Sequence, residues 1–413
     1  MNERLAAFRF SLLTERCDVS GFWRLMLFGK GPREAALPGR DLRIDAIRGL
    51  ILLIIFVNHM PGNVVSAWMP HNYGFSDAAD IFVLLAGVSA AFAYGRLIDQ
   101  RGMLVGALKV GARIWTLYIA HLALFVLVCG IIATAIVRTQ NSLYMEAINI
   151  QPFFSDTPAA VINALGLTYQ PYYLDILPLY IVLLALFPLI YVAARTSPLP
   201  TLLASLALWQ VATHLGWNLP NHPGEAGWFF NPFAWQVTFV LGVVLGRLAL
   251  VGARLPRLAL IDLMALGVLV FAAAVKLASG NFLAGVPVLG EWVDGLQIGI
   301  DKTNLAPVRL VHLLALVWLV LRYLRPGSAL LRSRIGGGLA VIGRHSLEVF
   351  CAGIVLAIAG QIILAETSFA LWVQLLVNFA GITILAGLGM FLSWYKTLTA
   401  RAAGAPREQP VAA

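Results

Sequence analysis

The chain has 413 residues, of which 60% are hydrophobic and only 12% are charged, and its formal net charge is +9. A soluble domain carries roughly a quarter of charged residues, so this composition excludes an ordinary soluble protein. Apolar runs of about 20 residues recur along the whole length, which is typical of a protein that crosses the bilayer many times. The basic residues fall in short loops between these runs, so the positive charge does not indicate nucleic-acid binding. We therefore predict an all-α integral membrane protein.

The first 39 residues form a basic segment without a long apolar run. Apolar side chains such as Phe8 and Trp23 are interleaved with arginines such as Arg9 and Arg24. Two interpretations stay open, a helix lying on an anionic membrane surface and a disordered basic tail. No apolar core is followed by a small-residue cleavage site, so a cleavable signal peptide is not evident.

Residues 40–395 contain the apolar segments that we expect to form one transmembrane domain, and residues 396–413 would be a tail. The expected spans are ten in number: 44–60, 77–95, 113–137, 174–194, 199–215, 234–250, 258–278, 305–324, 340–364 and 370–394. The fifth is short and the 336–345 region has a loop-like composition, so nine or eleven spans are alternatives. Every second inter-span segment is rich in Lys and Arg, which favour cytoplasmic loops. This alternation predicts a bundle of about ten helices with both termini in the cytoplasm.

The loops on the expected outer side are rich in aromatic, amide and carboxylate side chains. Aromatic faces stack on sugar rings and polar groups bond to hydroxyls, so this set favours a carbohydrate-binding surface. The alternative is the belt of Trp and Tyr that forms at any membrane interface. The candidates for contact with a glycan are Tyr73, Tyr172, Tyr173, Asp175, Asn231, Trp235 and Lys302.

The first expected span carries Arg48 near one end and His59 near the other. Eleven residues separate them, which leaves the two side chains about 20° apart around a helix and about 16 Å apart along it. A lipid-facing helix would avoid such groups. We interpret this stripe as the lining of a path between the two membrane surfaces, with a reaction at its outer end.

His59 has two candidate partners, Asp77 and Asp80, at the start of the next span. A neutral imidazole beside a carboxylate is the usual arrangement of a general base near neutral pH. The alternative is that His59 only caps a helix at the interface, next to Pro61 and Gly62. Neither a P-loop nor a cluster of metal ligands is present in the sequence.

Several motifs, taken together and in order, resemble the OpgC proteins of the wider membrane acyltransferase-3 superfamily. They are RDLRIDAIRGL, the Asn58–His59 pair, GFSDAADIFVLLAGVSAA, YYLDILPLY, NPFAWQ, DKTNLAPVRLVH and IGRHSLEVF. The resemblance implies a ten-helix architecture and transfer of acyl groups, chiefly succinyl, to glucose units of periplasmic glucans. It also implies that His59 is the catalytic residue. The chain departs from the superfamily at Lys109 and Arg113, which are four residues apart where two arginines three apart are common.

The resemblance and the residues together predict an O-acyltransferase of the bacterial inner membrane, with no permanently bound cofactor. The donor would be cytoplasmic acyl-CoA, most simply succinyl-CoA, and the acceptor a periplasmic glucan. His59 would accept the hydroxyl proton, Asp77 or Asp80 would orient its ring, and Asn58 would donate to the developing oxyanion. The residues expected to bind acyl-CoA are Arg48, Lys109, Arg113, Arg309, His312, Arg344 and His345.

Other interpretations stay open at this stage. Direct transfer and an acyl-histidine intermediate both fit the residues. An O-acetyltransferase that acts on another envelope glycan, a solute transporter and a non-catalytic scaffold are the alternative functions. The sequence leaves the oligomeric state undetermined.

Overall fold

The computed structural model describes Met26 and residues 41–224, 226–253, 256, 258–278 and 300–402. Except for Met26, the predicted N-terminal segment 1–39 lies outside the described residues, as does the tail after residue 402. The described chain is helical, with one isolated β-bridge between Pro220 and Gly227 and no β-strand. This confirms the all-α class. In chain order the helices are α3 (Leu42–Asn58), the 3-10 helices η1 (Val64–Trp68) and η2 (Pro70–Asn72), α4 (Ala78–Ala90), the π-helical turn η3 (Ala91–Gly95), α5 (Arg96–Arg101), α6 (Met103–Thr139), α7 (Leu143–Ala147), α8 (Gln151–Ser155), α9 (Thr157–Leu165), α10 (Ile176–Thr196), α11 (Pro198–Leu215), α12 (Pro232–Leu250), α13 (Ala259–Leu277), α15 (Pro307–Tyr323), α16 (Ala329–Arg332), α17 (Arg334–Arg344), α18 (Ser346–Glu366) and α19 (Leu371–Ala402).

Within the described residues, seven helical segments are long and apolar enough to cross a membrane. They are the continuous rod of α4, η3 and α5, together with α6, α10, α12, α13, α18 and α19. The protein is therefore a multi-pass membrane protein. Three further expected spans correspond to α3, α11 and α15. Of these, α3 and α15 have only 17 residues each, about 26 Å of helix against a hydrocarbon core of about 30 Å. The count of ten spans and the cytoplasmic termini stay predictions.

Two segments that the sequence suggests to be loops are helical. In the expected loop 96–113, α5 runs to Arg101 and α6 begins at Met103, so that Gly102 is the one residue between them. Gly102 has φ of +87°, which an L-residue adopts only with strain. The 336–345 region lies almost entirely in α17. Its glycines suit a close helix contact instead of a loop.

The close contact of α17 is with α3. A Cβ added at Gly49 would overlap the carbonyl oxygen of Leu339, and one added at Gly343 would overlap that of Asp45. Such small residues let two backbones approach, which is how helices associate in lipid, where apolar side chains gain little by leaving a hydrocarbon solvent. The helix α17 thereby fixes the position of α3.

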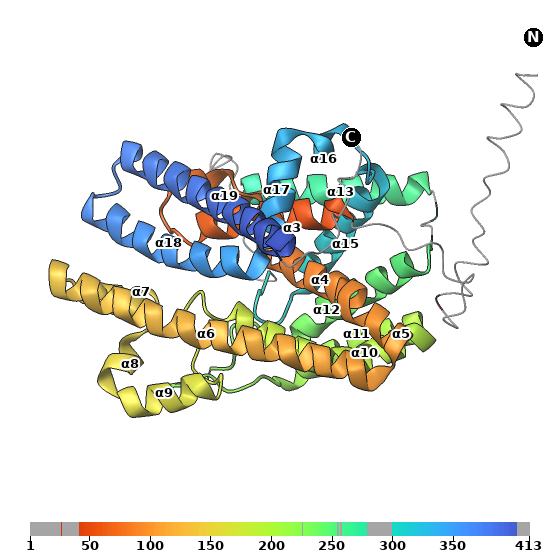
Figure 1. Ribbon diagram of the computed structural model, residues 1–413, viewed down its shortest axis with the longest axis horizontal. Coiled ribbons are helices and arrows are strands. Elements are labelled where there is room, and N and C mark those ends of the chain that lie inside the picture. The colour runs from red at the N-terminus through yellow and green to blue at the C-terminus, as the bar shows by residue number, and fades with distance from the viewer. Residues whose placement is uncertain are drawn as a thin grey trace, which may run out of the picture.

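A second glycine contact joins α4 to α12. Gly87 and Gly242 face each other, because a Cβ on either would overlap the backbone of the other helix. Gly246 continues this contact one turn further along α12. Figure 1 shows α3 and α4 in the middle of the bundle, with α18 and α19 side by side and α6 running beside α10. The two central helices are thus held by backbone contacts on opposite sides.

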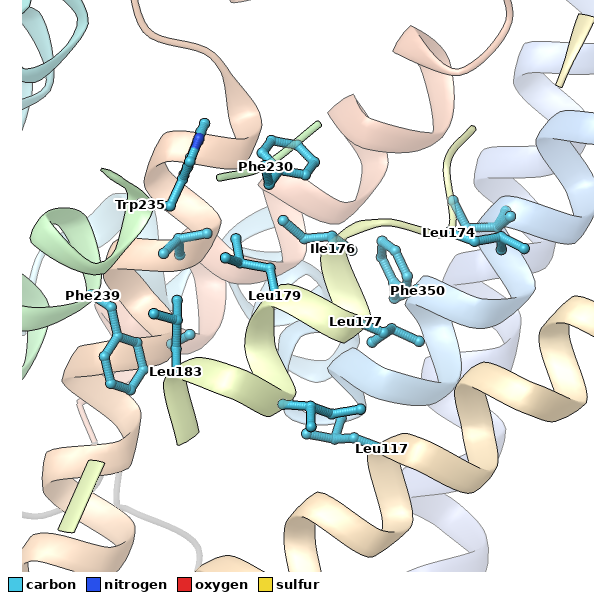
Figure 2. Close-up of a cluster of buried hydrophobic side chains, with 14 of the residues drawn as sticks. Leu117, Leu174, Ile176, Leu177, Leu179, Leu183, Phe230, Trp235, Phe239 and Phe350 are labelled. Carbon is cyan, nitrogen blue, oxygen red and sulfur yellow. The ribbon is translucent and has the colours of Figure 1, made fainter. Parts of the chain in front are cut away.

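The side chains of α10 form much of the apolar core near these helices. Figure 2 shows Leu177 of α10 between Leu117 of α6 and Phe350 of α18, and Leu183 of α10 beside Phe239 of α12. All five are buried. Consequently α10 is packed between α6, α12 and α18, and its first turn lies at one end of the same core.

Candidate active site

His59 is the first residue after α3, and three parts of the chain meet at its side chain. Its backbone N–H donates to Ile55 and Phe56 of α3, at 3.1 and 3.3 Å. The imidazole lies against the Tyr173 ring, with 4.5 Å between the ring centroids and 55° between the planes. The Gln361 side chain of α18 donates to the His59 carbonyl and forms a second hydrogen bond with the Tyr173 hydroxyl. His59 is therefore held by α18 through its carbonyl and by the segment before α10 through its ring.

The environment of the ring keeps it uncharged. Burial, assisted by the charge of Lys302, lowers the pKa of His59 to about 3, and the charge of Asp77 opposes this only in part. Nδ1 of His59 and Oδ1 of the neighbouring Asn58 are buried and make no hydrogen bond to any described residue. Unpaired buried polar atoms are rare and mark sites where a ligand or a reaction supplies the partner. The geometry gives a neutral imidazole that can take up a proton.

A cluster of four charged residues lies beside this ring. Asp77 and Asp80 form a capping box at the N-terminus of α4: the Asp77 side chain accepts the Ala79 backbone N–H, and the Asp80 side chain accepts the Asp77 backbone N–H. Lys302 lies 2.7 Å from Asp77, and Arg309 lies 3.3 Å from Asp77 and 2.5 Å from Asp80. Burial alone would raise the pKa of Asp77, but the charges of Lys302 and Arg309 outweigh it and hold that pKa below its ordinary value. Two acids and two bases thus form a partly desolvated, balanced network.

Asp77 and Asp80, the two candidate partners of His59, are paired with the cations of this network. In the part of the chain that the structure describes, neither Asp77 nor Asp80 hydrogen-bonds to the His59 ring. The charge of Asp77 nevertheless acts on that ring, whereas Asp80 is fully buried against Arg309. The orienting role of either carboxylate stays a prediction.

Arg309 and His312 also differ from expectation. Arg309 is bound to the two carboxylates, and the His312 ring lies 2.6 Å from the Ser76 hydroxyl, next to Asp77. Side chains near the start of α15 are thus bonded to side chains at and just before the start of α4. Both residues lie at the same end of the bundle as His59, away from the other predicted acyl-CoA-binding cations. Their positions do not support a contact with the donor head group.

The remaining cations divide into two groups. Arg48 donates to the Ser89 hydroxyl and to the Leu85 carbonyl of α4, and both Arg48 and Arg113 lie within electrostatic reach of the Tyr180 hydroxyl. Lys109 is exposed on α6, one turn before Arg113. On the other side of α3, Arg344 lies 3.7 Å from Asp45, and a His345 ring nitrogen lies 2.9 Å from the Ser393 hydroxyl. The structure brings together Arg48 and Arg113, which sequence spacing alone does not.

Two of the glycan-contact candidates are in the core. Asn231 and Trp235 are 1% and 0% exposed, respectively. The Asn231 amide donates to the side chain of Asn304, and the Trp235 indole donates to the carbonyl of Lys302. They therefore fix the segment that carries Lys302 and offer no surface to a glycan. This corrects the expectation, since aromatic and amide residues at a helix end serve packing as readily as recognition.

The other candidates lie where a ligand could reach them. Tyr172 is 51% exposed and Tyr73 is half-buried, with its hydroxyl 3.4 Å from the Ala67 carbonyl. Burial raises the pKa of Asp175, the residue before α10, to about 6. A cavity of about 190 Å³ opens between α3, α4, α13 and α15, beside this end of the bundle. Its polar lining comes from Tyr73, Ser76, Asp77 and His312.

Comparison with known proteins gives the family. The family model described as OpgC protein matches residues 40–397. The chain belongs to the OpgC family. The resemblance carried by the motifs is confirmed, and membership makes this OpgC protein a glucan-modifying acyltransferase. Neither a curated protein nor a solved structure matches the chain.

Proposed function

We propose that this OpgC protein moves an acyl group, most simply succinyl, from cytoplasmic acyl-CoA to a glucose hydroxyl of a periplasmic glucan, and that it does so across the inner membrane. The observation that carries the proposal is the position of the His59 imidazole at one end of α3, against the Tyr173 ring and next to Gln361. Arg48 lies on the same stripe of α3, about 16 Å away along the helix. Arg113 of α6 acts, with Arg48, on the Tyr180 side chain.

The chemistry follows from the uncharged ring. As the glucan hydroxyl oxygen attacks the thioester carbonyl carbon, His59 takes the hydroxyl proton. The new C–O bond forms, the C–S bond breaks, and the imidazolium returns its proton to the departing thiolate to give free CoA. The Asn58 amide is placed next to His59 in the chain and is the proposed donor to the oxyanion. Asp77 supports the imidazolium through its negative charge.

The donor reaches His59 without crossing the bilayer. The phosphates of CoA carry charges that the hydrocarbon core excludes, so its head stays at the inner surface. Arg48 and Arg113 offer guanidinium groups, which pair phosphates bidentately. Lys109, one turn before Arg113 on α6, and Arg344, beside Asp45 of α3, add positive charge. The thin, uncharged pantetheine arm then extends along the stripe between Arg48 and His59.

The glucan would bind near the loops that precede α4 and α10. Tyr73, Tyr172 and Asp175 lie in the chain segments that precede α4 and α10, and Tyr172 and Asp175 flank Tyr173, which contacts the His59 ring. An exposed tyrosine face can stack on a glucose ring while a carboxylate bonds to its hydroxyls. We assign these three residues to the glucan.

The decisive experiment uses purified protein in sealed vesicles of known orientation. Acyl-CoA supplied only on the cytoplasmic face should acylate glucan supplied only on the other face. His59→Ala should lower the rate of this transfer by roughly two to four orders of magnitude. Arg48→Ala should raise the apparent KM for acyl-CoA more than Arg344→Ala does. Transfer that requires both substrates on one side would reject the path, and movement of a labelled solute without ester formation would favour a transporter.

A further inference from the structure

Lys302 forms an ion pair with Asp77 and lies over two aromatic rings. Its Nζ lies 2.7 Å from Asp77, and the faces of Phe229 and Phe230 lie 5.7 and 5.4 Å away. An ammonium group has three N–H donors, and aromatic faces stabilise its charge without using one. The side chain is 33% exposed. Lys302 can therefore bind a second anion while it keeps Asp77.

The backbone around Lys302 is fixed. The Trp235 indole donates to the Lys302 carbonyl at 3.0 Å, and the following residues Thr303 and Asn304 donate their backbone N–H groups to the Asp301 carboxylate. A rigid support of this kind holds a side chain in the geometry that selective binding requires.

The ammonium group lies at the same end of the bundle as His59, since it is paired with Asp77, whose charge acts on the His59 ring. Figure 2 shows Phe230, over which Lys302 lies, next to Ile176 at the start of α10. Tyr173, three residues before Ile176, contacts the His59 ring. The charge of Lys302 acts on both His59 and Asp175. The cation and the imidazole therefore lie within electrostatic reach of each other.

We propose that Lys302 binds the distal carboxylate of a dicarboxylic acyl group and so selects succinyl over uncharged acyl groups such as acetyl. This inference rests on the proposed function, because it concerns the group that is transferred at His59. Arg309 is less suited to the task, since it is 5% exposed and already bound by two carboxylates. Asp77 keeps Arg309 as a partner when Lys302 turns toward the acyl carboxylate.

The test compares succinyl-CoA with acetyl-CoA in the same preparation of purified protein, with glucan from cells that lack this protein as the acceptor. The ratio of the two kcat/KM values does not depend on the amount of folded protein. Lys302→Met should lower the succinyl-to-acetyl ratio by roughly ten- to a hundred-fold. A hydrogen bond to a charged group contributes about that factor to binding. Lys302→Arg should keep most of the preference.

A matched control distinguishes a specific contact from the general field of positive charge. Lys276 of α13 also lies within electrostatic reach of Asp77. Lys276→Met should leave the ratio within about two-fold of the unaltered protein. An unchanged ratio in Lys302→Met, or an equal change in both variants, would overturn the selection role. A raised KM for glucan with an unchanged ratio would assign Lys302 to the acceptor instead. Absence of transfer from any acyl-CoA by the unaltered protein would overturn the proposed function as well.

Discussion

Tyr173 contacts the His59 ring from a backbone conformation that aromatic residues rarely adopt. The ring centroids are 4.5 Å apart, and Tyr173 has φ of +73°, in the left-handed region. Such a conformation costs of order 1–3 kcal/mol and persists where the surroundings enforce it, often at functional sites. Here the preceding Tyr172 is fixed by a 2.9 Å hydrogen bond from its N–H to the Ile148 carbonyl. The loop before α10 is thus shaped to bring Tyr173 to His59.

Gln361 should act as a positioning residue for His59. Gln361→Leu removes the hydrogen bonds to the His59 carbonyl and the Tyr173 hydroxyl, so we expect kcat to fall by roughly ten-fold while both KM values change little. Steady-state kinetics with each substrate varied would measure this. Tyr173→Phe, which keeps the ring contact, should lose less activity than Tyr173→Ala. Equal losses in the two Tyr173 variants would contradict a role for the ring.

Asp80 and Asp77 should affect different properties. Asp80→Asn leaves the buried Arg309 guanidinium short of a charged partner, and breaking a buried pair costs about 3–5 kcal/mol. We expect a lower melting temperature in detergent, with activity per folded molecule largely kept. Asp77→Asn should instead lower activity more than stability, because its charge acts on His59. The division would be wrong if Asp80→Asn melted like the unaltered protein.

The pH dependence of activity should reflect the neutral His59. An exposed histidine base loses half its activity near pH 6.5, but burial keeps His59 uncharged down to about pH 3. We therefore expect that protonation of His59 causes no loss of activity between pH 7 and pH 5. An inflection near pH 6 is assigned to Asp175 and should be absent in Asp175→Asn. The kcat/KM profile of both proteins would decide.

The stability of the folded protein should decrease as the pH falls below about 6.5. The unfolded chain protonates His59 below about pH 6.5, whereas the folded protein resists until about pH 3. Folding is therefore favoured above pH 6.5 and disfavoured progressively as the pH falls below it. His59→Gln should weaken this acid destabilisation, which thermal melting at several pH values can measure.

The glycine contact between α3 and α17 should tolerate no side chain. Gly49→Ala places a Cβ on the Leu339 carbonyl, so the helices must separate at a cost of about 1–3 kcal/mol or more. Gly337→Ala on α17 is the matched control, since its Cβ would meet no atom within 4 Å. We expect the first to lower the melting temperature and the second to leave it unchanged or raise it. Equal behaviour would refute the close contact.

The orientation in the membrane can be tested by labelling. A cysteine introduced near Asn72 should react with an impermeant reagent added outside cells whose inner membrane is intact. A cysteine introduced near Gly102 should react only after that membrane is permeabilised. The expectation comes from the Lys and Arg alternation along the chain. The reverse pattern would invert the path proposed for the donor.

The sequence by itself determined the membrane class, the central importance of α3 and the family. Helical periodicity is a property of one segment, so it placed Arg48 and His59 on one stripe without knowledge of any other helix. The OpgC motifs run along most of the chain, and their order is visible without structure.

The tertiary structure alone decided which groups meet. Arg309 pairs with Asp80, 229 residues away, and Trp235 supports Lys302 from within the core. Gln361, an isolated amide in an apolar span, gave only the general signal that polar residues inside a bilayer serve a function. In lipid both the buried and the exposed faces of a helix are apolar, so the hydrophobic pattern does not report its neighbours. Glycine contacts such as that of Gly49 set the helix crossings, and these crossings choose the partners.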